Sequence, residues 1–300
     1  MIAVACISAL LFSCAQKQSA QQQPRVPAVF VSIVPQKYFV DRIADGLVDC
    51  QVMVPPGANV HSYEPRPLQM SLLSKAKAYF AIGLEFEGPW LPKFAALSPL
   101  MKIIHTDSAV PKMAMAPDIE HEIDGSAPGN HDNGGSDPHI WLSPALVKLQ
   151  AGSIEQALEQ IDTSHSGIFR KNFTTFMRDI DSLEKQLRLI LPCDSARAAG
   201  RRTFLVFHPT WGYFARDFCL TQISIEVEGK EPSPRVMKEI LDIAKKYRIR
   251  TVFTQPEFSR KSAEVIAHEL HASVLDADAL AYDWKNNLLS VAKAFAAGGK

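Results

Sequence analysis

The sequence lacks an excess of charge of either sign. Its 32 Lys and Arg residues balance its 32 Asp and Glu residues, so the formal net charge is zero at pH 7. It also lacks a basic stripe with interleaved aromatic residues, the pattern typical of nucleic-acid-binding proteins. We therefore expect no nucleic-acid partner. The 300 residues, 47% of them hydrophobic, suffice for one large domain or two of ordinary size.

Cysteine is scarce, and no Cys-x-x-Cys pair is present, which argues against a thiolate zinc site or a redox dithiol. The five cysteines are Cys6, Cys14, Cys50, Cys193 and Cys219. The first two lie in the N-terminal segment. The remaining three are an odd number, so no complete disulfide framework follows. They are interpreted as small buried apolar residues, with a Cys193–Cys219 pair as the alternative.

The N-terminal residues 1–13, MIAVACISALLFS, form an apolar run too short to span a bilayer permanently. They are typical of a secretory signal peptide. The junction LLFSC resembles a bacterial lipoprotein signal, in which Cys14 becomes the lipidated N-terminus; an ordinary signal peptide is the alternative. Residues 14–26 indicate a polar tether. We therefore expect an extracytoplasmic, membrane-anchored lipoprotein, in the periplasm or on the cell surface.

Short β-branched or apolar runs alternate with helical patterns along the rest of the chain. Strands are predicted at 28–34, 50–56, 79–83, 102–106, 203–208, 222–227, 250–255 and 273–277. Helices are predicted at 36–46, 66–78, 89–97, 143–161, 166–192, 210–219, 233–249, 260–272 and 282–298. This alternation predicts an α/β protein with parallel sheets covered by helices.

The segment 166–192 is the longest helical pattern and separates two such βα blocks. Its apolar residues recur near a 3.6-residue period: Ile168, Phe173, Phe176, Ile180, Leu183, Leu187 and Ile190. We expect two Rossmann-like lobes joined by one long rigid helix. The predicted boundaries are an N-terminal lobe at 27–165, the linking helix at 166–192 and a C-terminal lobe at 193–300.

Candidate ligand residues follow several of the predicted strands, where open α/β sheets bind their ligands. His61, His139 and His208 belong to separate βα units, and Asp278 follows the last strand. Three imidazoles and one carboxylate suit tetrahedral zinc, and they also admit manganese. By position alone, Asp276 is as good a candidate as Asp278. A lone histidine at a strand end is more often a capping or surface residue.

Other histidines and acidic residues compete with this set. His105 also ends a predicted strand, and His165 lies beside a helix start. The sequence HELH at 268–271 spaces its histidines three residues apart, whereas the zinc-protease motif HExxH requires four. It is interpreted as a helix surface. Residues 117–138 predict a long mobile surface loop; its acidic residues are interpreted as solvated, with a metal-collecting role as the alternative.

Five motifs together resemble the metal-binding solute receptors of bacterial ABC importers for zinc and manganese. They are PPGANVHSYEPRP, DPHIWLSP, FHPTWGYFARDF, EGKEPSP and DALAYDW, in that order between about residues 27 and 290. The resemblance implies two Rossmann-like lobes joined by a long helix, with metal in the cleft between them. It implies His61, His139, His208 and Asp278 as ligands. A histidine at position 208 resembles the zinc receptors, whereas manganese receptors usually have Glu there.

The resemblance therefore implies a receptor, not an enzyme, that captures zinc, or less readily manganese, and delivers it to an ABC-transporter permease. We expect a monomer held at the membrane by lipid on Cys14. Two alternatives are a metal-dependent hydrolase, which needs a general base beside an open metal position, and a surface adhesin that contains a metal.

Overall fold

The computed structural model describes residues 26–115, 136–193, 203–226, 232–258 and 260–298. The expected signal peptide, Cys14, most of the tether and residues 116–135 of the expected loop lie outside this described part. Within it, none of the helices has the length and apolar character needed to cross a membrane.

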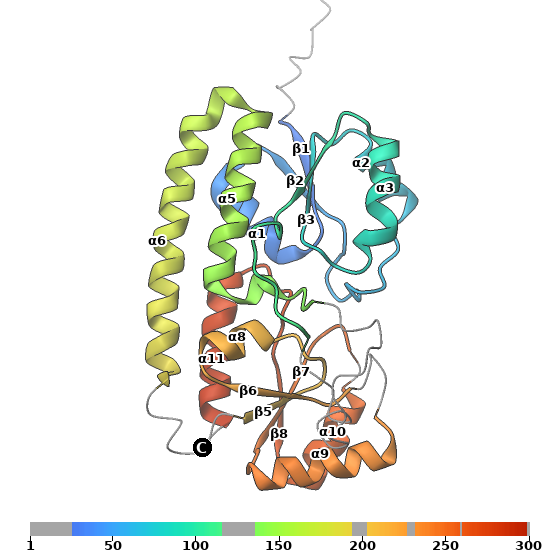
Figure 1. The fold of residues 1–300 in the computed structure, drawn as a ribbon, viewed down its shortest axis with the longest axis vertical. Helices are drawn as coiled ribbons and strands as arrows, with labels where there is room; N and C mark the ends of the chain where they lie inside the picture. Colours follow the sequence, from blue (N-terminus) through green and yellow to red (C-terminus); the bar gives the residue numbers. More distant parts are fainter. Residues whose placement is uncertain (1–25, 116–135, 194–202, 227–231, 259, 299–300) are drawn as a thin grey trace, which may run out of the picture.

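Two parallel four-stranded sheets form the centres of two lobes (Figure 1). The first sheet has the order β2-β1-β3-β4 and the second the order β6-β5-β7-β8, so the second lobe repeats the topology of the first. The strands are β1 Ala28–Val31, β2 Asp49–Val52, β3 Ala78–Ala81, β4 Lys102–His105, β5 Thr203–Val206, β6 Thr221–Ser224, β7 Thr251–Thr254 and β8 Ser273–Asp276. The predicted α/β fold class and its eight strands are confirmed.

Helices separate successive strands, as parallel pairing requires. They are α1 Val34–Ala44, α2 Pro67–Leu73, α3 Glu87–Leu97, α5 Pro144–Ile161, α6 Ser166–Ile190, α8 Gly212–Asp217, α9 Pro234–Lys246, α10 Lys261–Leu270 and α11 Trp284–Gly298, with 3-10 turns η1 Ile140–Leu142 and η2 Thr163–His165. Helix α2 ends earlier than predicted. The backbone of Lys75 and Ala76 bonds back into α2 while Lys77 bonds to Ala28, which turns the chain into β3.

Helix α6 runs along both lobes and joins them, as predicted (Figure 1). It packs on α5, α1 and α11. Its buried face consists of Phe169, Phe176, Ile180, Leu183 and Leu187. The predicted stripe was wrong at one position, because Ile168 is 43% exposed and its neighbour Phe169 is buried instead.

Helix α11 contacts both lobes, although the sequence assigned it to the C-terminal lobe. Near its start, the Trp284 ring packs edge-on against Phe39 of α1 at 5.3 Å, and its Nε1 donates to the Trp141 carbonyl at 2.7 Å. Near its end, Phe295 stacks on Phe204 of β5 with ring centroids 4.2 Å apart. One hydrophobic core cluster therefore continues from the first lobe into the second.

The three cysteines within the described residues divide between a disulfide and a buried thiol. Cys193, just after α6, is bonded to Cys219, just after α8, with a Cα–Cα distance of 5.6 Å. Cys50 is buried and free. The pairing that the sequence left as an alternative is therefore present, and it ties the end of the long helix to the second lobe.

Candidate metal centre

The three candidate histidines lie in segments that follow strands at their carboxyl ends. His61 lies in the segment between β2 and α2, where Gly57 adopts a φ of +77° that suits a residue without a side chain. His139 directly precedes η1, and His208 lies two residues after β5. The first two therefore come from the N-terminal lobe and the third from the C-terminal lobe. This is the edge of an open sheet at which ligands bind.

The fold brings these three side chains together. One ring nitrogen from each of His61, His139 and His208 lies within 4.8 Å of the other two. The Nε2 atoms of His61 and His208 are 3.0 Å apart, and the three pairs of ring centroids are 4.8 to 5.4 Å apart. Because zinc binds imidazole nitrogen at about 2 Å, nitrogens at this separation can share one ion.

Each of these histidines contacts a carboxylate through its Nδ1 atom. His61 pairs with Glu85 at 2.7 Å, His139 with Asp137 at 2.7 Å and His208 with Glu226 at 2.6 Å. An ionised carboxylate can only accept a hydrogen bond, so each Nδ1 carries the hydrogen and each Nε2 keeps its lone pair. A carboxylate behind a histidine in this way fixes the ring and makes it a better metal ligand.

The three Nε2 atoms are therefore hydrogen-bond acceptors that lie close together and have few donors nearby. His139 is 1% exposed, and its Nε2 has no hydrogen-bond partner among the described residues. A buried acceptor without a partner is costly. A cation placed among the three lone pairs would remove that cost, so the donor set fits a divalent metal.

Burial keeps His208 neutral, as a metal ligand must be. It lowers the pKa of His208 to about 4, although the adjacent Glu226 acts in the opposite direction. In Glu85, burial raises the carboxyl pKa, but the hydrogen bond from His61 and the smaller effects of neighbouring groups together leave it below its ordinary value. The Glu85 carboxylate is thus held in the ionised form that His61 requires.

Asp278 does not join the histidine cluster in this structure. It is partly buried after β8, its Oδ1 accepts the backbone N–H of Leu280 at 2.7 Å, and burial raises its pKa. The competing candidate, Asp276, is already engaged, because its carboxylate accepts from Thr254 at 2.9 Å and forms an ion pair with Arg260. Of the two aspartates, Asp278 is therefore the better candidate, because Asp276 is 61% exposed and its charge is already paired with Arg260.

The remaining histidines considered lie apart from this cluster. His105 is mostly exposed at the end of β4, and His165 pairs with Asp162 at 2.6 Å. His268 is 87% exposed on α10, which agrees with the interpretation of HELH as a helix surface. His271 is exposed directly after α10.

The sequence did not identify the carboxylates behind the histidines. Glu85 and Glu226 follow β3 and β6, and their position after strands was the available signal. Asp137 was interpreted as part of a solvated loop, and this was wrong at the end of that loop. Asp137 and Pro138 are buried, because the Asp137 carboxylate is bonded to His139.

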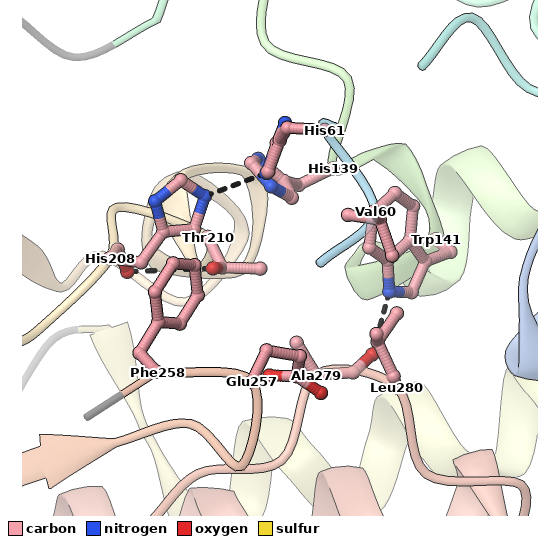
Figure 2. Close-up of a pocket in the computed structure, with 10 residues that line it drawn as sticks. All are labelled: Val60, His61, His139, Trp141, His208, Thr210, Glu257, Phe258, Ala279 and Leu280. Carbon is pink, nitrogen blue, oxygen red and sulfur yellow. Dashed lines mark hydrogen bonds between the residues drawn. The ribbon is translucent and has the colours of Figure 1, made fainter. Parts of the chain in front are cut away.

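The histidines border a pocket that is lined by residues of both lobes (Figure 2). Val60, His61, His139 and Trp141 come from the N-terminal side, and the other lining residues, His208, Thr210, Glu257, Phe258, Ala279 and Leu280, come from the C-terminal lobe. Trp141 is fully buried behind His139, and its Nε1 donates to the Ala279 carbonyl at 2.7 Å. Trp141 therefore anchors His139 and also bridges the two lobes.

Comparison with known proteins gives the same family by sequence and by structure. Residues 29–294 match the family model described as zinc-uptake complex component A, periplasmic, or ZnuA. The high-affinity zinc uptake system protein ZnuA of Bacillus subtilis is 22% identical over 259 residues, which are 85% of this chain and 79% of that protein.

Two crystal structures extend this likeness. A structure of ZnuA is 40% identical, with a TM-score of 0.81 over 92% of this chain and 100% of that one. A zinc-bound ZnuA deletion mutant is also 40% identical, with a TM-score of 0.80 over 92% of this chain and 98% of that one. A family model that covers most of the chain, together with this fold, settles the classification: the chain belongs to the ZnuA family of periplasmic zinc-uptake components.

Proposed function

We propose that this protein is an extracytoplasmic receptor that captures Zn²⁺ between its two lobes and delivers it to an ABC-transporter permease. The observation that carries the proposal is the convergence of three imidazoles, each backed by a carboxylate, from both lobes. The ligands in this proposal are His61, His139, His208 and Asp278. The zinc-uptake relatives and the zinc-bound ZnuA structure support zinc as the cargo.

The carboxylates that contact the three imidazoles suit binding of the ion and not catalysis. The nearest acidic side chains, Glu85, Asp137 and Glu226, accept hydrogen bonds from the imidazoles. A carboxylate held in this way orients a ligand and is poorly placed to remove a proton from metal-bound water. A receptor needs only to bind and release its ion, so this set of contacts suits capture and transfer.

The order of the parts in the chain is a further component of the proposal. Residues 1–13 act as a signal peptide, Cys14 carries the lipid, and residues 14–26 form a tether. The N-terminal lobe at 27–165 follows, then the linking helix at 166–192 and the C-terminal lobe at 193–300. Contacts of α6 with α1, α5 and α11 support the role of the linking helix. The receptor works as a monomer, since each lobe of one chain supplies ligands to the ion.

Metal capture is tested by native mass spectrometry of protein purified without added metal, followed by zinc titration and manganese competition. We expect one zinc ion per chain and loss of that ion in His139→Ala and His208→Ala. His268→Ala, a change on the exposed face of α10, is the matched control and should retain it. Full zinc affinity in the His208→Ala variant would overturn the proposed site.

A further inference from the structure

Glu257 offers a carboxylate at the pocket without a side-chain partner. It lies in the segment after β7 and lines the same pocket as the three histidines, across from them in Figure 2. Among the described residues, no other side chain forms a hydrogen bond or ion pair with its carboxylate. A partly buried carboxylate without such a partner is costly unless the pocket supplies one.

The segment that carries Glu257 is fastened to His208. The side chain of Gln255 donates to the His208 carbonyl at 2.7 Å and accepts the His208 backbone N–H at 3.3 Å. On the other side of Glu257, the Phe258 ring stacks on the His208 imidazole with centroids 4.8 Å apart. Glu257 therefore lies between two residues that both hold His208, so its position relative to that ring is set by the fold.

A second acidic residue lies close to Glu257. Burial is the main cause that raises the pKa of Glu257 to about 7, and the negative charge of Asp278 acts in the same direction. The Glu257 carboxyl on the pocket wall, with Asp278 close behind it in the chain segment that carries Ala279 and Leu280, adds oxygen donors to the three imidazole nitrogens. Imidazole suits zinc, whereas carboxylate oxygen suits manganese, and zinc itself can expand from four to five ligands.

We propose that Glu257 donates a carboxylate oxygen to the ion held by the three histidines, in addition to Asp278, and that this oxygen sets how well the site accepts Mn²⁺ relative to Zn²⁺. This inference rests on the proposed function. Neither carboxylate belongs to the cluster of ring nitrogens. The proposal therefore requires the Glu257 side chain to rotate across the pocket toward the ion.

The test compares the metal-free wild-type protein with Glu257→Gln, Asp278→Asn and, as a matched control, Glu264→Gln on the exposed face of α10. Zinc affinity is measured by chelator competition and manganese affinity by calorimetry. We expect Glu257→Gln to weaken Mn²⁺ binding by about tenfold or more, with a smaller loss for Zn²⁺. The absorption bands of Co²⁺ bound at the site should become more intense in Glu257→Gln. Loss of one oxygen ligand lowers the coordination number, and these bands strengthen as the coordination number falls.

Unchanged affinities for both ions and an unchanged cobalt spectrum in a folded Glu257→Gln variant would overturn this role. The His139→Ala variant shows whether such a result contradicts only the role of Glu257 or the proposed metal site as a whole. If His139→Ala abolishes binding while Glu257→Gln changes nothing, the role of Glu257 alone is wrong. If His139→Ala keeps full zinc affinity, the histidine site itself is wrong.

Discussion

The hydroxyl of Tyr213, on helix α8 of the C-terminal lobe, donates to the backbone carbonyl of Asp137, two residues before His139. The O···O distance is 2.9 Å, and the same hydroxyl accepts the backbone N–H of Met113 at 3.0 Å. One side chain of the second lobe thus fixes the segment of the first lobe that carries a candidate ligand and its carboxylate.

Tyr213→Phe should therefore affect both stability and zinc binding. Loss of the hydroxyl removes two hydrogen bonds at a buried position, which should lower the free energy of unfolding by about 1 kcal/mol or more. Zinc affinity should fall several-fold because Asp137 and His139 lose their support. Urea denaturation and chelator competition measure the two effects, with Tyr247→Phe, at a position that is 42% exposed, as control. Equal zinc affinity in Tyr213→Phe and the wild-type protein would contradict this coupling.

Glu226→Gln tests the contribution of a carboxylate behind its histidine. The amide oxygen still accepts from His208 Nδ1, but the negative charge that strengthens the imidazole as a ligand is lost. We expect zinc affinity to fall by about tenfold, with little change in the fold. Glu239→Gln on α9, which is paired with Arg235 at 3.2 Å, is the control. Identical zinc dissociation constants for the two variants would rule out this role for Glu226.

The metal-free protein should lose stability in mild acid. The pKa of His208 is about 4 in the folded protein and near its ordinary 6.5 in the unfolded chain. The unfolded state therefore binds more protons between these values, so the free energy of unfolding decreases as pH falls from about 6.5 to about 4. The full loss from this residue is about 3 kcal/mol. His208→Gln should reduce the slope of this pH profile in urea titrations, whereas His268→Gln should leave the slope unchanged. The same slope in His208→Gln as in the wild-type protein would refute the assignment.

Removal of the disulfide should destabilise the C-terminal lobe. Cys193 and Cys219 are 26 residues apart, and a crosslink of that span stabilises a fold by about 3 to 4 kcal/mol in the chain-entropy model. The Cys193→Ser/Cys219→Ser variant should melt at a lower temperature than the wild-type protein. Reductant should lower the melting temperature of the wild-type protein and leave that of the variant unchanged. Cys50 should contribute little, since burial raises its pKa and keeps the thiol unreactive. Equal melting temperatures with and without reductant would contradict this prediction.

Much of the fold could be predicted because parallel α/β folds have a strong local signature. Each buried strand is a short apolar run, and the Ser-Pro pairs at 143–144 and 233–234 start helices in which Ser143 and Ser233 accept a backbone N–H as caps. The exact face of α6 was harder to predict. Ile168 and Phe169 are adjacent and both apolar, and only the packing of α6 decides which of them is buried.

Local patterns were enough to predict the order of strands and helices, the two similar halves and the residue types that can hold a metal. These features depend on local periodicity and on the chemistry of single residues. Their position after predicted strands singled out His61, His139 and His208 among the nine histidines, and the family resemblance implied the same three as ligands. The tertiary structure was needed to show which side chains contact one another. It placed Glu85, Asp137 and Glu226 behind the imidazoles, engaged Asp276 with Arg260 and set Glu257 across the pocket. Such contacts join residues far apart in the chain, and no local pattern encodes the distance between them.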